Sequence, residues 1–127
     1  MILLQIDIKP KPAPRPRVTR WGTYNDPKYT TYKGVISGVA RAEVKRLLVG
    51  ALKMSVFFQF KKPKSWRKKK KAAAYWHTQK PDLDNLIKGV KDALNGIAYK
   101  DDAQVCDMDA IKIWGECDLI VIEIEEI

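Results

Sequence analysis

The sequence predicts a small α+β domain with one mixed sheet and two main helices. Apolar residues alternate with polar ones near both ends of the chain, which is the two-residue period of a strand with one buried face. Two internal stretches instead carry apolar side chains every three or four residues, the period of an amphipathic helix. The length of 127 residues suits one domain with a real core, so we expect residues 1–127 to fold as a single unit.

The chain begins with a predicted strand and a proline-rich arm. Residues 2–8 show the alternation of a strand with one inner face. Four prolines within residues 10–16 then exclude helix and sheet interior, so we expect an extended start to a basic arm that covers residues 10–30. Arginine and aromatic side chains are interleaved in this arm, which fits contact with nucleic acid, and the alternative is an arm packed over the core. The candidate DNA-contacting residues of the arm are Arg15, Arg17 and Arg20.

A helix and a buried strand follow the arm. Apolar residues at helical spacing, with lysine and arginine on the opposite side, predict a helix over residues 27–48. Pro27 suits the first turn of this helix, and Gly50 suits its end. Residues 51–60, ALKMSVFFQF, are rich in β-branched and aromatic side chains and predict a buried strand.

A lysine-rich tract covers residues 61–71, where eight of eleven residues are Lys or Arg. Such a run is usually solvated or disordered by itself, although Ser65 could cap a short helix that ends near Tyr75. Each lysine that meets a phosphate adds about 0.9 to the slope of log affinity against log salt. The alternative is a nuclear-localisation signal, which nothing else in the chain supports. The candidate phosphate contacts of the tract are Arg67, Lys68, Lys69, Lys70 and Lys71.

The net charge of +9 hides a division of the chain into a basic and an acidic part. Residues 1–80 contain 20 basic and 3 acidic side chains, whereas residues 81–127 contain 4 basic and 12 acidic ones. A polyanionic partner that meets an acidic site would explain this separation, and a merely solvated basic face is the alternative. No apolar run approaches the roughly 20 residues that span a bilayer, and the first residues lack the features of a signal peptide. We therefore expect a cytoplasmic protein without a membrane partner.

Two aspartates stand one residue apart in the stretch KPDLDNLIKG, residues 80–89. In a helix, residues two apart point about 200° from each other, whereas in extended backbone they point the same way. We therefore expect Asp82 and Asp84 side by side in extended backbone. The helix would start near Asp84 or Asn85, which places Lys88 one turn above Asp84. Helix capping accounts for one aspartate, and the repulsion from a second would be relieved by Mg²⁺ or Mn²⁺, which favour hard oxygen ligands.

A second acidic pair follows the helix and its Asn-Gly stop signal. Asp101 and Asp102 are expected in a turn that leads into a strand over residues 104–114, and residues 118–127 form the last strand. Adjacent residues of extended backbone face opposite ways, so one of this pair can join the first site and the other cannot. Together the two pairs predict two or three carboxylates that bind Mg²⁺ and leave positions open for water.

Other chemistries find no support in the sequence. His77 is the only histidine and there is no nucleophile elbow, which argues against a serine hydrolase. The glycine-rich motifs that hold nucleotide phosphates are absent, so no nucleotide cofactor is expected. An EF-hand is excluded because Ile87 occupies the position of that loop's glycine. Cys106 and Cys117 show neither the spacing of a zinc site nor a disulfide framework.

The run PKSWRKKKKAAAYWHTQKPDLDNLIKGVKDALNGIAYKDDAQV, residues 63–105, strongly resembles the RusA family of Holliday-junction resolvases, which phages and prophages often carry. The stretch KPAPRPRVTRWGTYNDP, residues 11–27, resembles the basic N-terminal segment of the same family. The resemblance implies a RusA-like fold and a small Mg²⁺-dependent homodimeric endonuclease. Such an enzyme binds four-way DNA junctions and cuts two opposing strands symmetrically.

The resemblance also implies roles for individual residues. The matches to the catalytic, metal-binding aspartates are Asp82, Asp84 and Asp102. Asp101 is the weaker candidate ligand, and Lys88 matches the family's catalytic lysine. Relatives often carry a basic residue directly before the motif, where this chain has Pro81, so Lys80 is a candidate DNA contact one step earlier. Two alternatives stay open: a basic module that binds nucleic acid without cutting it, and a metal-dependent nuclease with less selectivity for junctions.

Overall fold

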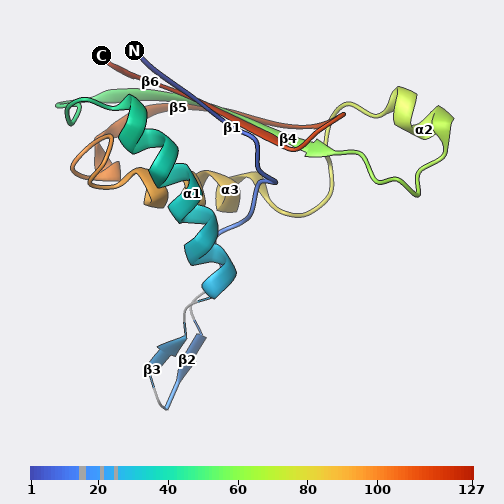
Figure 1. The fold of residues 1–127 in the computed structure, drawn as a ribbon, viewed down its shortest axis with the longest axis horizontal. Helices are drawn as coiled ribbons and strands as arrows, with labels where there is room; N and C mark the ends of the chain where they lie inside the picture. The colour runs from blue at the N-terminus through green and yellow to red at the C-terminus, as the bar shows by residue number, and fades with distance from the viewer. Residues whose placement is uncertain (15–16, 21, 25) are drawn as a thin grey trace.

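The structure, a computed structural model, describes residues 1–14, 17–20, 22–24 and 26–127. Among these residues the elements run, in chain order, β1 (Ile2–Ile6), β2 (Arg17–Thr19), β3 (Gly22–Tyr24), α1 (Pro27–Glu43), β4 (Leu52–Lys61), α2 (Lys68–Ala73), α3 (Leu83–Leu94), the 3₁₀ turn η1 (Asp102–Gln104), β5 (Val105–Gly115) and β6 (Leu119–Glu126). The predicted α+β class is confirmed, with α1 and α3 as the two main helices (Figure 1).

Four strands form one mixed sheet in the order β1-β6-β4-β5. β4 pairs in parallel with β5, whereas β6 pairs antiparallel with both β4 and β1. Parallel strands cannot be joined by a tight turn, so the chain leaves the sheet after β4 and returns to it through residues 62–104. The short strands β2 and β3 pair with each other and form a hairpin that extends away from the sheet (Figure 1).

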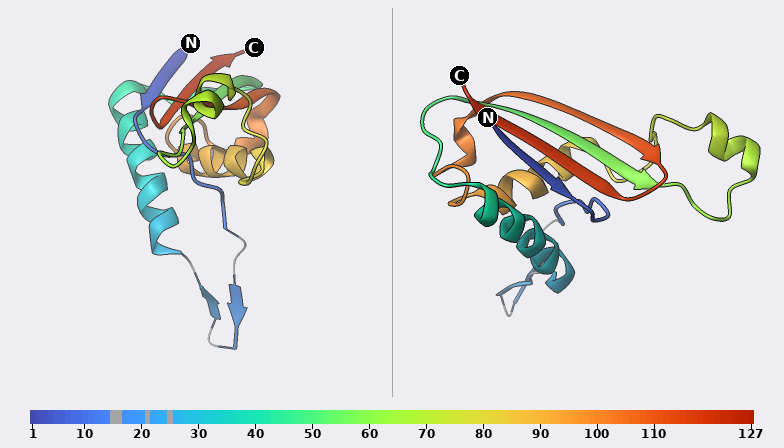
Figure 2. Two further views of the ribbon diagram at one scale, coloured as in Figure 1. Left: turned by 90° about the vertical axis from the view of Figure 1, so that its right-hand side faces the viewer. Right: turned by 45° about the horizontal axis from the view of Figure 1, so that its top comes forward.

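The core lies between one face of the sheet and the helices α1 and α3 (Figure 2). Every second side chain of β4 from Leu52 to Phe60 is buried, and β6 continues the pattern with Ile120, Ile122 and Ile124. Successive strand residues point to opposite faces, so this alternation places one whole face of the sheet beneath the helices. No described helix or strand covers the other face of the sheet.

Helix α1 begins as its sequence predicts. Asp26 is the N-cap residue, and its carboxylate accepts a hydrogen bond from the Lys28 backbone N–H at 2.9 Å. Pro27 occupies the first turn, where its missing N–H would have no helical partner. Neither α1 nor any other helix among the described residues is long and apolar enough to cross a membrane.

Helix α1 ends at Glu43, so the predicted end near residue 48 is wrong. The chain turns extended at Val44, and the Leu48 backbone N–H then donates to the Ala98 carbonyl oxygen at 2.8 Å. Because the Leu48 N–H is bonded to the loop after α3, it does not donate to a carbonyl oxygen of α1. The Leu48 side chain is buried at this position. Gly50 does not end the helix but adopts a positive φ of 74° in the turn before β4.

Helix α2 lies on an excursion of the chain beyond the end of β4 (Figure 1). Arg67 is its N-cap residue, so the expected cap at Ser65 is wrong, and none of the residues of α2 is buried. The Lys70 ammonium lies 4.3 Å from the centroid of the Trp66 ring. Trp66 in turn packs edge-on against Trp114 of β5, with ring centroids 4.7 Å apart. The excursion is therefore tied to the sheet by Trp66, and the Lys62 ammonium after β4 also donates a hydrogen bond to the Lys71 carbonyl oxygen of α2.

His77 is buried against aromatic side chains near the end of β5. Its ring stacks on Trp114, with ring centroids 3.9 Å apart and planes 16° apart, and lies 4.5 Å from the Phe60 ring. Its Nδ1 accepts a hydrogen bond from the Gln79 backbone N–H at 3.3 Å. Burial lowers the pKa of His77, and the nearby Lys112 ammonium lowers it further. The folded protein therefore favours the neutral form of this imidazole.

We expect the free energy of unfolding to fall as the pH drops below about 6.5, the ordinary pKa of histidine. The unfolded chain binds a proton there while folded His77 stays neutral, so acid favours unfolding until the pH also passes the lowered folded pKa. Urea unfolding at about pH 7.5 and about pH 5.5 measures this loss. The His77→Phe variant keeps an aromatic ring against Trp114 and should lose less stability over the same interval. An equal loss in both proteins would contradict this role of His77.

Candidate active site

Asp82 and Asp84 lie at the start of α3. Asp82 is the N-cap residue, with extended backbone (φ −69°, ψ 144°), and its carbonyl oxygen accepts a hydrogen bond from the Leu86 N–H at 3.2 Å. Asp84 lies in the first helical turn, so the prediction that both aspartates stand in extended backbone is wrong. The helix begins one residue earlier than expected, at Leu83, whose side chain packs against the core. Both carboxylates are exposed where the helix dipole favours negative charge.

Neither of these carboxylates makes a hydrogen bond or an ion pair within the described part of the chain. Asp82 makes no side-chain capping hydrogen bond. The ion pairs and side-chain hydrogen bonds of the described residues likewise involve neither Asp82 nor Asp84. Capping therefore does not account for the pair, and exposed, unpartnered carboxylate oxygens are donors of the kind that Mg²⁺ prefers.

Lys88 is exposed on the solvent side of α3, one turn beyond Asp84. Its neighbour Gly89 is buried where the arm crosses the helix, and a Cβ added there would lie 3.4 Å from the Lys11 carbonyl oxygen. The side of α3 that faces the core consists of Leu86, Val90, Ala93 and Leu94. Packing of this apolar stripe thus fixes Lys88 on the same outer surface as the start of the helix.

Lys112 of β5 holds the loop that leads into Asp82. Its ammonium donates hydrogen bonds to the carbonyl oxygens of Gln79 and Pro81, at 2.5 and 2.6 Å. Burial lowers the pKa of Lys112, and the negative charge of Asp82 acts in the opposite direction. Lys112 therefore both fixes the backbone before Asp82 and lies within electrostatic range of its carboxylate. Sequence reasoning missed this residue, because no local pattern shows which carbonyl oxygens a strand lysine reaches.

Asp101 and Asp102 form the predicted turn directly before β5. The Asp101 carboxylate accepts a hydrogen bond from the Ala103 N–H at 2.9 Å, and this bond, aided by one with Asp102, lowers the pKa of Asp101. Gln104 completes the capping box by accepting hydrogen bonds from the backbone N–H groups of Lys100 and Asp101. Asp101 therefore has a structural role of its own in the turn.

Asp102 is half-buried and neighbours Tyr99. Burial raises the pKa of Tyr99 and the Asp102 charge adds to this, while the Tyr99 hydroxyl donates to the Lys91 carbonyl oxygen at 2.8 Å. Asp102 thus neighbours the later turns of α3, whereas Asp82 and Asp84 stand at its start. Among the described residues, no three Asp, Glu, His or Cys side chains gather in a group that could hold a metal ion. The site of three carboxylates stays a prediction.

The basic candidates lie on separate parts of the chain. On the α2 excursion, the exposed members are Arg67, Lys68, Lys69 and Lys70, and Lys71 is half-buried. Lys80 is exposed in the loop directly before Asp82. Of the arm candidates, Arg15 lies outside the described residues, Arg17 begins β2 and Arg20 is exposed at the hairpin turn.

The first part of the arm packs over the core, as the alternative interpretation of the sequence proposed. Pro10 is buried, and the Ala13 backbone N–H donates to the Asn85 carbonyl oxygen at 3.1 Å. These contacts hold the extended chain across α3 close to its first turn. The later part of the arm does not share this packing but continues into the β2–β3 hairpin.

Comparison with known proteins decides the family. Residues 7–125 match the family model described as Endodeoxyribonuclease RusA. The chain belongs to the RusA family. It is 37% identical over 105 residues to the uncharacterized protein YqaN of Bacillus subtilis (strain 168), a match that covers 78% of this chain and 72% of YqaN. It is also 38% identical over 79 residues to the crossover junction endodeoxyribonuclease rusA of Lactococcus phage r1t, which covers 60% of this chain and 55% of the phage protein.

The RusA match confirms the family that the sequence motifs indicated. RusA proteins are endodeoxyribonucleases, hydrolases that act on DNA. The matched residues include the arm, the α2 excursion and α3, as well as the turn before β5. Both acidic pairs therefore lie within the part of the chain that defines membership of the RusA family.

We expect the Lys112→Met variant to loosen the loop before Asp82. Methionine keeps the length of the side chain but removes two charge-assisted hydrogen bonds, which should lower the free energy of unfolding by about 1–3 kcal/mol. Hydrogen exchange should be faster than in the wild type over residues 78–83. The matched variant Lys53→Met, on the neighbouring strand β4, should leave that exchange unchanged. Wild-type exchange rates over residues 78–83 in Lys112→Met would show that another contact holds the loop.

Proposed function

We propose that this RusA protein is a Mg²⁺-dependent endodeoxyribonuclease that resolves four-way DNA junctions by paired, symmetric strand cuts. The observation that carries the proposal is the pair of exposed, unpartnered carboxylates of Asp82 and Asp84 at the start of α3, in a chain of this nuclease family. The phage relative is named as a crossover junction endodeoxyribonuclease, which favours branched DNA as the substrate. The enzyme would meet such DNA in the cytoplasm of a bacterial cell.

The candidate metal ligands are Asp82, Asp84 and Asp102, with Asp101 as the weaker candidate. Their carboxylate oxygens have the hardness that Mg²⁺ requires, and Mn²⁺ could replace it. The bound metal would supply an acidified water for in-line attack on a phosphodiester and would polarise the phosphoryl oxygens. Asp101 already accepts the capping hydrogen bond of η1, which leaves its carboxylate less free to serve as a ligand.

The protein's own cations would support this chemistry. The exposed Lys88 ammonium forms no ion pair among the described residues and would stabilise the negative charge that develops on the phosphate or the leaving oxygen. Lys112 would keep the Asp82 backbone in place through its hydrogen bonds to the preceding loop. Removal of either cation would therefore impair catalysis for a different reason.

The α2 excursion and the arm would hold the backbone phosphates of the DNA. The exposed ammonium groups of α2 are free to reach phosphate oxygens, because the helix buries none of its residues. Such contacts supply affinity that is independent of sequence and weakens with salt. Lys80 would extend this basic surface to the edge of the active site.

Paired cuts require two active sites, which a two-fold symmetric homodimer would provide. The uncovered face of the sheet offers a surface for a second copy of the chain. Phe57 stands between Ile111 and Val121 in the strand registers, so the centre of this face is apolar. Lys53 and Glu123 carry opposite charges on the same face and could pair between two copies packed against each other.

A second candidate function is a module that binds branched DNA without cutting it. The observation in its favour is that Asp102 neighbours the later turns of α3, away from Asp82 and Asp84, in the described structure. A nuclease with less selectivity for junctions would keep the same site and differ only in its substrate.

An end-labelled four-way junction should be cut at symmetric positions with Mg²⁺, and a linear duplex of the same sequence should stay intact. Asp82→Asn and Asp84→Asn should each lower the cleavage rate about 100-fold or more, because an amide is a poorer ligand for Mg²⁺. Lys88→Met should lower it by about 100- to 1,000-fold. Gel retardation should show that all three variants still bind the junction.

Asp7→Asn is the matched control, since it removes an exposed carboxylate outside α3 and η1 and should cut at the wild-type rate. A junction that is bound but remains uncut with Mg²⁺ and with Mn²⁺ would establish the binding module instead. Equal cutting of the junction and the duplex would establish the less selective nuclease.

A charge placed in the centre of the uncovered sheet face should separate the two copies. We expect the wild type to sediment as a dimer and Phe57→Glu to sediment as a monomer, because an unpaired carboxylate in an apolar interface is costly to bury. Ala42→Glu adds the same charge to an exposed position of α1 and should remain dimeric. A monomeric wild type, or a dimeric Phe57→Glu variant with wild-type circular dichroism, would exclude this surface.

A further inference from the structure

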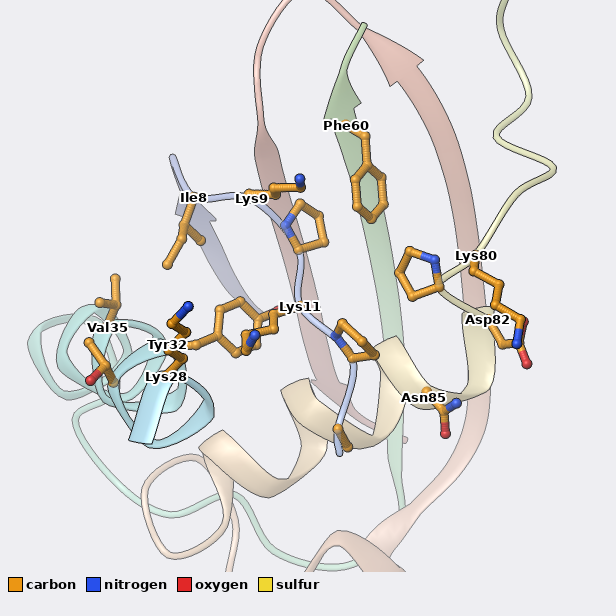
Figure 3. A pocket seen from close by; sticks show the side chains of 15 residues that line it. Ile8, Lys9, Lys11, Lys28, Tyr32, Val35, Phe60, Lys80, Asp82 and Asn85 are labelled. Carbon is orange, nitrogen blue, oxygen red and sulfur yellow. The ribbon is translucent and has the colours of Figure 1, made fainter. Parts of the chain in front are cut away.

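A hollow of about 820 Å³ lies between the arm, α1 and the start of α3 (Figure 3). Residues 8–13 of the arm run along it, with Tyr32 and Val35 of α1 on one side and Asp82 and Asn85 on the other. This volume lies within the range of roughly 300–1,000 Å³ that is usual for small-ligand sites. Because Asp82 belongs to both the hollow and the candidate active site, the two are continuous.

Rigid apolar groups and ammonium groups are the most frequent side chains in the lining of this hollow. Flat or rigid apolar groups come from Pro10, Pro12, Tyr32, Phe60 and Pro81. Ammonium groups come from Lys9, Lys11, Lys28 and Lys80. Among the described residues of the lining, Asp82 is the one carboxylate, and a further carboxylate, Asp26, lies 4.0 Å from the Lys11 ammonium. The lining therefore suits a ligand that combines negative charge with a flat apolar part.

Tyr32 adds an unsatisfied polar group beneath the arm. Its side chain is 4% exposed, and its hydroxyl has no hydrogen-bond partner among the described residues. Burial raises the pKa of Tyr32 to about 12, and the Lys11 backbone N–H, which approaches without making a hydrogen bond, acts in the opposite direction. A buried hydroxyl without a partner costs about 1–3 kcal/mol. A small shift of the arm around a ligand could give this hydroxyl a partner.

The wall that the arm contributes is preformed. Its prolines fix the backbone φ angle, and the Ala13 hydrogen bond to Asn85 anchors the arm to α3. A site that is ordered before binding loses little further conformational entropy when the ligand binds. The arm's side of the hollow is thus held in place by contacts within the protein itself.

We propose that the hollow receives one unstacked nucleotide of the bound DNA strand, next to the phosphodiester that faces Asp82 and Asp84. The base would lie against the partly exposed rings of Pro12 and Pro81, and its phosphate would meet the lysines at the rim. This inference rests on the proposed nuclease function, because it assigns a neighbouring part of the same DNA strand to the hollow.

The observations favour a nucleotide over other anionic ligands. Every base offers a flat face that stacks on an aromatic or rigid apolar surface, and each is joined to a phosphate that lysine can hold. A base at a branch point also costs less to unstack than one inside a continuous duplex, because the strands exchange there and the stack of bases is interrupted. An acidic peptide would satisfy the lysines but would not explain why the hollow opens beside the carboxylates.

An abasic scan of the four-way junction tests the proposal. Single abasic nucleotides are placed in turn at each position near the branch point, and the dissociation constant is measured by fluorescence anisotropy with Ca²⁺ in place of Mg²⁺. We expect one position, adjacent to the cleaved phosphodiester, at which loss of the base weakens binding by about 5- to 150-fold, as stacking energies of about 1–3 kcal/mol predict. No effect at any position would overturn the proposal.

The variant Val35→Trp places a bulky ring at the α1 side of the hollow and should weaken binding of the intact junction. It should also become insensitive to the abasic nucleotide at the sensitive position, because base and indole compete for one space. Ala42→Trp, at an exposed position of α1 outside the hollow, should behave as the wild type. Lys28→Gln, a change at an exposed rim residue, serves as a second variant and should weaken binding at every position equally.

The outcomes separate this inference from the proposed function. Junction cutting with Mg²⁺ together with a flat abasic scan would overturn the nucleotide site alone. A sensitive position that remains equally sensitive in Val35→Trp would place the base elsewhere on the protein. A junction that is bound with a sensitive position, yet never cut, would support the nucleotide site and overturn the nuclease.

Discussion

The parallel pairing of β4 with β5 is the constraint on which the rest of the structure depends. A parallel neighbour cannot be reached by a tight turn, so the chain between these strands must leave the sheet and cross over it. The crossover, residues 62–104, contains α2, α3 and η1. Every candidate catalytic residue except the supporting Lys112 is therefore carried by one connection, and Lys112 on the returning strand β5 ties that connection back to the sheet.

Because the helices pack on one face of the sheet only, the two faces of the sheet present different surfaces. Because α1 and α3 both cover the same face, the start of α3 and the arm meet at one edge of that layer, where the hollow opens beside Asp82 (Figure 3). The opposite face keeps Phe57 and its neighbours available for a second copy of the chain.

The sequence predicts the core of this fold well, because periodicity is a local property. The alternation from Leu52 to Phe60 is visible in the letters of β4, and the apolar stripe of α3 is equally plain. The ends of the helices were harder to predict, since they depend on distant contacts. Helix α1 stops where Leu48 bonds to Ala98 far along the chain, and α3 starts where Leu83 meets the core. Lys112 and the hollow escaped prediction for the same reason, as both are made by segments that only the fold brings together.

The basic charge of the chain affects how the exposed carboxylates of Asp82 and Asp84 would bind a metal ion. In the free protein, the excess positive charge of residues 1–80 would offset their mutual repulsion. DNA would remove that compensation, because its phosphates pair with the same lysines and bring new negative charge toward the carboxylates. A divalent cation between carboxylates and phosphate would relieve both repulsions at once. On the proposed function, DNA and Mg²⁺ should therefore bind with positive cooperativity.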